Sequence, residues 1–266
     1  MPMTMSTTPL NTLVLQTQPL PGVCLLTLNR PEARNALNDA LRKELSQAVA
    51  LAANDPEIRV IVITGEGESF AAGADLKEIA GDTPVAIRRR RVLSLWQQLT
   101  NCPLPIIAAV RGHALGGGCE LALHADIIIV AEDAVIGQPE VRVGVMPGGG
   151  ATQRLMRAIG KYRAMKLVLT GEPITGAQAA QWGLASEAVA SNKVLERALE
   201  LAQRICKLPP LAVQSAKEAM LAGADAALAT GLLLERRLFE GLFATEDQKE
   251  GMTAFAEKRE PNFKGQ

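Results

Sequence analysis

The sequence predicts an α/β fold that is followed by a mainly helical C-terminal region. Two observations support this prediction. As far as Gly150, short apolar segments rich in Ile and Val alternate with segments of helical periodicity. Beyond Gly150, almost every apolar pattern has the spacing of a helix. Because strands that alternate with helices usually pair in parallel, we expect a parallel sheet with helices on its faces.

The strands expected before Gly150 are uninterrupted apolar runs, and several end at turn residues. Runs of this kind are typical of strands that are buried on both faces. The first strand leads into the turn Asn29-Arg30-Pro31, and Gly65 ends the second. The expected strands cover residues 23–28, 59–64, 106–110 and 126–131.

The helices between these strands have recognisable ends. Asn38 is the expected N-cap of a helix that reaches about Asn54, because an Asn side chain accepts a hydrogen bond from the first turn and apolar residues recur at helical spacing. A second helix is expected at 85–99, closed by Cys102-Pro103, and a third at 117–124.

The region after Gly150 carries more apolar stripes than one small sheet can cover. We therefore expect some of them to contact another subunit. The predicted division is an α/β core at 1–200, with a frayed polar start at 1–10, and a helical oligomerisation region at 201–266. Helices are expected at 152–159, 162–169, 176–182, 194–207, 211–221 and 226–242, with a short strand at 187–189.

The composition indicates a globular enzyme without nucleic-acid or membrane partners. The 266 residues are 48% hydrophobic, and 28 Lys and Arg balance 28 Asp and Glu, so no net charge attracts a polyanion. The four cysteines form no CxxC pair, which indicates free thiols in a reducing compartment and no metal site. No nucleotide-binding glycine motif is present, so we expect no bound cofactor. Residues 1–29 contain no Lys or Arg, so we expect no targeting segment and a cytoplasmic location.

Two glutamates lie in glycine-rich, otherwise apolar segments. Glu120 ends Gly116-Gly117-Gly118-Cys119-Glu120, and Glu140 ends Gly137-Gln138-Pro139-Glu140. A buried carboxylate is costly unless it is paired or hydrogen-bonded, so both are expected to have a task. A third segment of small residues, 70–77, can turn backbone N–H groups toward a ligand. Together these parts predict an oxyanion held by backbone donors beside two carboxylates that transfer protons.

Each part also has a structural interpretation. A Gly-Gly-Gly run that opens a helix is often a turn with tight packing. Glu120 can face the helix dipole in a first turn, and Glu140 can be a loop acid. His113 and His124 are expected to be structural, because no Ser/His/Asp set accompanies them. The arginine run 88–91 is expected to be a solvated helix face.

The series of motifs resembles the enoyl-CoA hydratase (crotonase) family. The similar segments follow one another in a single order from about Cys24 to the last residue. They are residues 70–75, 116–122 followed by Asp126, 138–140, 147–155 and 244–255. The resemblance implies a core of repeated ββα units and a C-terminal helical region used in trimerisation.

The resemblance also implies roles for the central residues. The backbone N–H groups of Ala74 and Gly117 correspond to the oxyanion hole for a thioester carbonyl. Glu120 corresponds to the carboxylate that deprotonates water, and Glu140 to the one that delivers a proton to the α-carbon. Two carboxylates that share one water are expected to have different proton affinities, so that one serves as the acid and the other as the base.

Coenzyme A is implied as part of the substrate and not as a bound cofactor. Phe255 and Lys258 correspond to residues that reach the CoA of a neighbouring subunit in a trimer or a dimer of trimers; the alternatives are a core phenylalanine and an exposed lysine. Asp75 has the alternative of a helix cap, and Arg34 that of a surface arginine. Within the subunit, the path of CoA is expected along Ala33, Arg34, Ala72, Gly73, Asp75, Leu76 and Lys77.

The activity that the resemblance implies is hydration of a trans-2-enoyl-CoA to a 3-hydroxyacyl-CoA. Alternatives on the same scaffold are double-bond isomerisation and thioester hydrolysis, which often keep one glutamate or move it, and a non-catalytic CoA- or RNA-binding relative. The acyl group is either a short chain of fatty-acid β-oxidation or the dehydroadipyl group of phenylacetate breakdown. An arginine of 88–91 would meet the terminal carboxylate of the latter.

Overall fold

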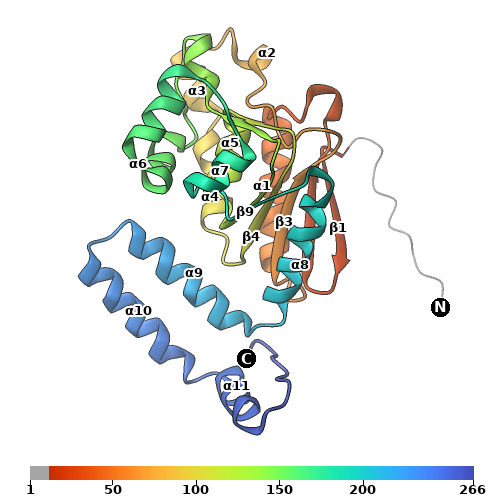
Figure 1. Ribbon diagram of the computed structural model, residues 1–266, viewed down its shortest axis with the longest axis vertical. Helices are drawn as coiled ribbons and strands as arrows, with labels where there is room; N and C mark the ends of the chain where they lie inside the picture. Colours follow the sequence, from red (N-terminus) through yellow and green to blue (C-terminus); the bar gives the residue numbers. More distant parts are fainter. Residues whose placement is uncertain (1–11) are drawn as a thin grey trace, which may run out of the picture.

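The computed structural model describes residues 12–266, apart from the side chains of Ser94 and Leu95. The frayed start expected at residues 1–10 lies outside the described residues. Figure 1 shows an α/β body from which an arm of C-terminal helices extends. The predicted α/β class with a helical C-terminal region is confirmed.

The larger sheet has the strand order β1-β2-β3-β4-β6-β9. Its strands pair in parallel except for β1 and β2, which form an antiparallel hairpin. The four strands predicted before Gly150 and the one at 187–189 are confirmed to within one residue. β1 was not predicted, because most of its residues are exposed and the polar run Gln16-Thr17-Gln18 interrupts its apolar residues. The bounds are β1 Val14–Leu20, β2 Val23–Leu28, β3 Val60–Gly65, β4 Ile106–Val110, β6 Ile127–Ala131 and β9 Glu187–Val189.

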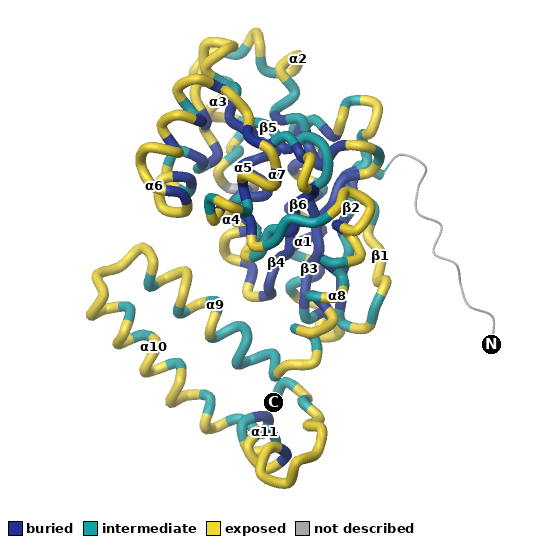
Figure 2. Tube along the Cα trace, in the orientation of Figure 1, coloured by how far each residue is buried: buried dark blue, intermediate teal, exposed yellow. Residues whose placement is uncertain are grey.

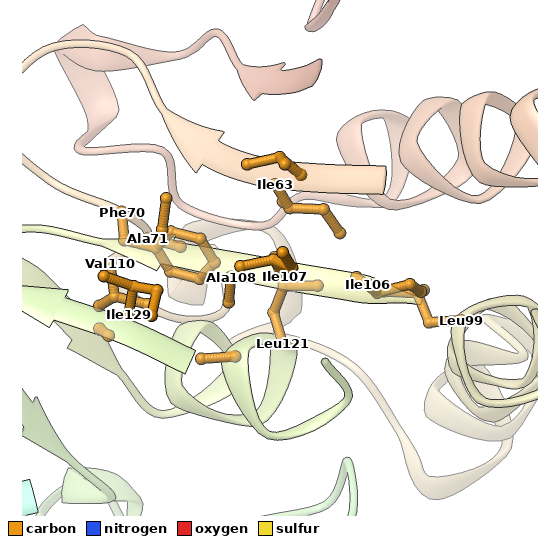
Figure 3. Close-up of a cluster of buried hydrophobic side chains, with 14 of the residues drawn as sticks. Ile63, Phe70, Ala71, Leu99, Ile106, Ile107, Ala108, Val110, Leu121 and Ile129 are labelled. Carbon is orange, nitrogen blue, oxygen red and sulfur yellow. The ribbon is translucent and has the colours of Figure 1, made fainter. Parts of the chain in front are cut away.

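The core forms around β3 and β4, which are buried at every residue (Figure 2). Helix α1 (Asp39–Asn54) packs against β1 and β2, and α8 (Val194–Cys206) packs against β3 and β4. Figure 3 shows Phe70 and Leu121 among the β4 side chains. Each large apolar side chain buried in this way contributes about 2 kcal/mol. Phe70 begins the small-residue segment and Leu121 follows Glu120, so both site segments are anchored in the core.

Several predicted helix ends are confirmed. The Asn38 side chain accepts a hydrogen bond from Leu41 N at 2.9 Å and caps α1. Helix α6 (Ala151–Thr170) is interrupted at Gly160, which has φ 76° and ψ 166°, so the two predicted helices at 152–159 and 162–169 are separate. Helix α7 (Gly176–Trp182) has the predicted bounds and a capping box at Thr175.

The single helix predicted at 85–99 is wrong. The chain forms α3 (Pro84–Arg89) and α4 (Val92–Thr100), and Arg91 between them has φ 49°. Arg90 bonds Asp82 at 2.5 Å and Asp39 of α1 at 2.6 Å, whereas Trp96 of α4 is buried in the core. One straight helix does not satisfy both attachments. The helical spacing of apolar residues continues across the break, and this spacing reports only local structure. The sequence therefore contained no sign of the break.

A smaller sheet, of order β5-β7-β8, places the two glutamates. β5 (His113–Leu115) pairs in parallel with β7 (Val135–Gly137), and β8 (Ile174–Thr175) pairs with β7. β5 leads into helix α5 (Gly117–Leu123), which carries Glu120, and β7 leads into the 3₁₀ turn η2 (Pro139–Val143), which carries Glu140. These strands are too short to show a periodic pattern, so the sequence did not predict them.

The C-terminal arm consists of α9 (Pro210–Ala224), α10 (Leu228–Leu242) and α11 (Glu246–Glu257). Helices α9 and α10 form a hairpin with no buried residue, which Figure 2 shows as exposed and half-buried chain. The predicted boundary after residue 200 falls inside helix α8, which packs against the sheet. The arm therefore begins after α8. Within residues 12–266, no helix is long and apolar enough to cross a membrane. Cys24, Cys102, Cys119 and Cys206 are free thiols, as predicted.

Candidate active site

Two backbone N–H groups meet where the small-residue segment passes the start of α5. Leu37 N donates to Gly73 O, and Asp75 N donates to Leu37 O. Because the carbonyl and the N–H of the trans peptide between Gly73 and Ala74 point in opposite directions, Ala74 N–H points away from Leu37. A methyl group on Gly117 would lie 3.5 Å from Ala74 N. Gly117 is the first residue of α5, so its N–H has no acceptor within the helix. The two predicted oxyanion donors are therefore neighbours.

Glycines allow this close approach. A side chain on Gly118 would overlap the Ala71 carbonyl, and one on Gly73 would lie 3.0 Å from Leu115 O. Gly73 also has φ 115°, a region that strongly favours glycine. The glycine run thus has the packing role of its structural interpretation, and this packing brings Gly117 and Ala74 together.

Glu120 lies in the first turn of α5 and is 5% exposed. Its Oε1 accepts hydrogen bonds from Gly149 N at 2.6 Å and Ala151 N at 3.2 Å. Burial raises the pKa of Glu120, while these two N–H groups and the charge of Arg42 lower it. Its other oxygen, Oε2, accepts no hydrogen bond from the described residues and is available to a water or a substrate.

Glu140 lies against Gly116, next to the Gly117 donor. A methyl group on Gly116 would be 3.1 Å from Glu140 Oε1. The buried Gln138 side chain, with its amide nitrogen toward the carboxylate, donates to Glu140 Oε1 at 2.8 Å and Oε2 at 3.2 Å. Burial raises the pKa of Glu140 to about 7, and the charge of Glu120 adds to the rise. Near neutral pH, Glu140 is therefore partly protonated.

This arrangement has the parts of an acid–base site. Two N–H donors can hold an oxyanion, one half-buried carboxyl group carries a proton near neutral pH, and one buried carboxylate has a free oxygen. Glu120 and Glu140 come from different segments, and their environments differ. The structure brings together the four central residues that the sequence singled out.

The other predicted contact residues of the subunit flank this centre. Ala72 N donates to Arg34 O at 2.9 Å, which joins the two segments expected along the CoA path. Arg34, Leu76 and Lys77 are exposed, Ala33 is half-buried and Gly73 is buried. Asp75 occupies the N-cap position of α2 (Leu76–Ile79), but its carboxylate makes no cap bond and pairs instead with Arg30 at 3.2 Å. The helix-cap alternative for this side chain is wrong.

Phe255 and Lys258 lie far from the glutamates of their own chain. Figure 1 places α11 at the opposite end of the molecule from α2. Phe255 is 87% exposed, so the core alternative is wrong, and Lys258 ends α11 with φ 56°. The structure therefore does not bring these two predicted contact residues together with the others within one chain.

The arginine run 88–91 is not the uniform solvated face that was predicted. Arg88 and Arg89 are exposed. The Arg90 guanidinium is engaged by Asp82, Asp39 and the Glu78 carbonyl. Arg90 therefore holds the segment after α2 against α1, and this engagement does not favour it as the ligand of a substrate carboxylate.

Sequence reasoning missed several residues that shape the site. Gln138, Gly149 and Ala151 lie inside the quoted motifs, but nothing local indicated that they bond the glutamates. Two buried donors also have no hydrogen-bond partner among the described residues, Arg42 Nε and Trp96 Nε1. A buried Arg in the apolar stripe of α1 was a signal that the sequence did contain.

Comparisons with known proteins identify the relatives of this chain. A family model described as enoyl-CoA hydratase/isomerase matches residues 20–266. A 2,3-dehydroadipyl-CoA hydratase of Escherichia coli is 51% identical, over 91% of this chain and 95% of that protein. A probable enoyl-CoA hydratase of Rhizobium meliloti is 49% identical, over 95% and 98%. The crystal structure of an enoyl-CoA hydratase from Bacillus anthracis superposes with a TM-score of 0.92 at 39% identity, covering 96% of this chain and all of that one.

Proposed function

The chain belongs to the enoyl-CoA hydratase/isomerase family, and on that premise we propose that it adds water to a trans-2-enoyl-CoA through Glu120 and Glu140. The predicted crotonase fold and the hydro-lyase class are confirmed. The observation that carries the proposed mechanism is the pair of carboxyl groups in unlike environments beside the Ala74 and Gly117 donors.

The proposed reaction assigns one step to each of these groups. The thioester oxygen accepts from Ala74 N–H and Gly117 N–H, which stabilise the charge that develops as water attacks. Glu120 takes a proton from the water, whose oxygen bonds carbon 3. The π electrons of the double bond form the enolate, and Glu140 gives its proton to carbon 2. One lost oxyanion donor costs about 3 kcal/mol of barrier, and each positioned carboxyl group contributes about 10²- to 10⁴-fold.

Loss of the conjugated enoyl chromophore tests the proposal. The parent should consume crotonyl-CoA with formation of 3-hydroxybutyryl-CoA. Glu120→Gln and Glu140→Gln keep the shape of each side chain but remove its proton transfer, so each should lower kcat at least 100-fold. Binding of the CoA thioester should survive, as measured by calorimetry.

The same assay separates the alternatives. An isomerase shifts the double bond of a 3-enoyl-CoA without adding water, and a hydrolase releases free CoA thiol. A non-catalytic relative binds CoA or RNA and turns over none of these thioesters. If both Gln variants retained more than a tenth of the parent rate, the acid–base roles would be wrong.

A second candidate function concerns the acyl group of the substrate. The buried donors Arg42 Nε and Trp96 Nε1, which have no hydrogen-bond partner among the described residues, favour an acyl group that ends in a carboxylate. Arg42 and Trp96 are 7% and 4% exposed, so donors without partners there are costly. Trp96 Nε1 and Glu120 Oε2 lie 2.9 Å and 2.5 Å from the point where a side chain on Gly149 would begin, so both face the same space. The charge of Arg42 also reaches Glu120.

The size of a six-carbon dicarboxyl acyl chain suits this position. Its terminal carboxylate lies three bonds beyond the carbon that water attacks, which is at most about 4 Å. A carboxylate there can accept from Trp96 and from Arg42, whose ion pair with Asp39 is long at 3.4 Å, whereas the Arg90–Asp39 pair is 2.6 Å. The name of the Escherichia coli relative indicates the same substrate class.

A matched pair of substrates tests this candidate. The dehydroadipyl thioester and the neutral trans-2-hexenoyl thioester have equal length, and the former should be preferred by about 10- to 100-fold in kcat/KM. Arg42→Met should remove the preference, whereas Arg89→Gln, at an exposed position, should keep it. Equal use of both substrates by the parent would exclude the carboxylate site and leave the hydratase proposal untouched.

A further inference from the structure

His124 lies directly after α5 and touches the turn that bonds Glu120. Its Nε2 is 3.1 Å from Gly149 O. On the other side of the ring, Nδ1 is 3.0 Å from an Arg154 guanidinium nitrogen and 3.1 Å from Thr100 Oγ1. The ring stacks on Trp96, with centroids 5.1 Å apart. The residue is 9% exposed, so its orientation is held by these contacts.

Arg154 determines which ring nitrogen carries the proton. A guanidinium group only donates hydrogen bonds, so Nδ1 must accept, and the proton of the neutral ring lies on Nε2. Nε2 then donates to the Gly149 carbonyl. Burial, with the positive charge of Arg154, lowers the pKa of His124 to about 4, so the ring is neutral in the pH range of the assay.

The turn that this bond holds has little rigidity of its own. Residues 148–150 are three consecutive glycines, and Gly150 has φ 112°. Glycine loses more backbone freedom than any other residue when it is ordered. Yet this turn must present Gly149 N–H and Ala151 N–H to the same oxygen of Glu120. The Gly149 carbonyl, on the same residue as one of these donors, is the atom that His124 holds.

We propose that Arg154 and His124 form a positioning relay that fixes the 148–151 turn on Glu120 Oε1 and leaves Oε2 free for water. Neither residue touches the reacting atoms. The relay acts on the proposed function through the base, since the N–H groups that it fixes favour the ionised carboxylate. A displacement of about 1 Å at a catalytic group can lower the rate 100-fold. Mobility of the glycines in this turn would therefore lower the rate of hydration.

The relay borders a cavity that Glu120 does not line. His124 and Arg154 line a cavity of about 600 Å³, shared with Thr100, Lys217 of α9 and Asp225. A small cation can therefore reach the place of the Arg154 guanidinium without entering the space between the glutamates.

Two His124 variants separate positioning from packing. His124→Phe keeps a flat ring against Trp96 but removes both nitrogens, and His124→Gln restores an N–H donor near Nε2. We expect His124→Phe to lower kcat about 10- to 100-fold with KM within threefold, and to move the acidic limb of the kcat/KM profile to higher pH. His124→Gln should recover most of the lost kcat. A Phe variant with the parent rate and profile, or a Gln variant as impaired as Phe, would overturn the proposal.

Arg154 provides an independent test. Arg154→Ala should show the same two changes, and millimolar guanidinium, which fits the emptied place in the cavity, should restore part of the rate; absence of any rescue in a protein with the parent melting temperature would contradict the relay. In the double variant, Arg154→Ala should add little to His124→Phe, because both interrupt one chain of contacts.

A measurement without turnover distinguishes this inference from the hydratase proposal. The Glu120 carboxyl titration, followed by ¹³C NMR and assigned with Glu120→Gln, should move to higher pH in His124→Phe. If the parent hydrates no enoyl-CoA and this shift is still seen, the proposed function fails and the relay stands. If hydration is found and no shift is seen, the relay fails alone.

Discussion

Glu120 and Glu140 differ in proton affinity because their surroundings differ. Both are partly or fully buried, and burial raises both pKa values. Glu120 receives two backbone N–H bonds, which favour its ionised form. Glu140 is beside Glu120, whose negative charge favours the protonated form of Glu140. Burial and this charge raise the pKa of Glu140 to about 7. The N–H bonds at Glu120 and the charge beside Glu140 therefore favour Glu140 as the member of the pair that holds the proton.

This pair predicts how activity depends on pH. Hydration needs a proton on Glu140 and none on Glu120, so kcat/KM should fall about tenfold per pH unit above the upper pKa of the pair, near 7. Dehydration of the 3-hydroxyacyl thioester starts from the same net protonation and should show the same profile. An alkaline limb near pH 9, or profiles that differ between the two directions, would contradict this account.

Stability should show the cost of the ionised Glu140. Its raised pKa in the folded state means that ionisation opposes folding, a cost that is absent below about pH 4.5 and complete above pH 7. After allowance for partial exposure, the cost is about 1 kcal/mol. Glu140→Gln should therefore melt about 2–4 °C above the parent at pH 8 and at the same temperature at pH 4.

The control for this comparison is Glu132→Gln, at an exposed position near β7. It should change the melting temperature by less than 1 °C at both pH values, on the scale of ordinary surface substitutions. A Glu140→Gln protein that is less stable than the parent at pH 8 would show that the Gln138 contact outweighs the cost of burial.

At the level of elements, the first residue of α5 contributes a backbone N–H to the proposed oxyanion hole. Gly117 occupies the N1 position, which tolerates proline because its N–H has no helical acceptor. Gly117→Pro removes that N–H, and Gly117→Ala keeps it while adding a methyl group at ordinary contact distances of 3.5 Å and 3.6 Å. We expect the Ala variant to keep at least a third of kcat and the Pro variant to lose at least 100-fold.

Circular dichroism and melting temperature serve as the fold control for this pair. Both variants should retain the parent helix content, since α5 begins at the substituted residue. A folded Gly117→Pro protein with near-normal turnover would remove Gly117 from the oxyanion hole. An inactive Gly117→Ala protein would show instead that the space around α5, and not the donor, decides activity.

At the level of the whole molecule, the C-terminal arm leaves apolar surface that one chain does not cover. Leu228, Leu232, Leu233 and Phe239 of α10 are each at least half exposed. Patches of this kind usually mark interfaces, and identical chains usually assemble with closed symmetry. We infer a homo-oligomer, a trimer or a dimer of trimers. Light scattering should give an oligomer for the parent and a smaller species for Leu232→Glu/Leu233→Glu, whereas Glu132→Gln should assemble as the parent does.

The assembly predicts a role for the end of α11. Phe255 and Lys258 lie far from the glutamates of their own chain, so we infer that in the oligomer they meet the CoA of a neighbour. Lys258→Ala removes a charge that contacts phosphate equally in ground and transition states, so KM should rise about tenfold with kcat nearly unchanged. An active monomer at assay concentrations would contradict both the proposed oligomer and the contact of Lys258 with a neighbour's CoA.

The sequence by itself determined those features of the fold and of the site that depend on neighbouring residues. The family resemblance singled out Ala74 and Gly117, whereas the Asn38 cap, the separate helices at 152–159 and 162–169, the buried strands and the carboxylates Glu120 and Glu140 were predicted from the residues themselves. Each depends on a few adjacent residues, such as a side chain that caps its own helix, a glycine that leaves helical geometry or an apolar run long enough for a strand.

Only the tertiary structure decided how the distant segments meet. Pairing of β5 with β7 brings Glu120 and Glu140 to one place, and the 148–151 turn supplies the donors for Glu120 from about 30 residues away along the chain. The break between α3 and α4 arises because Arg90 is held by α1 while Trp96 is held by the core. Such outcomes depend on contacts between segments far apart in sequence, and periodicity, which reports spacing within one segment, carries no information about them.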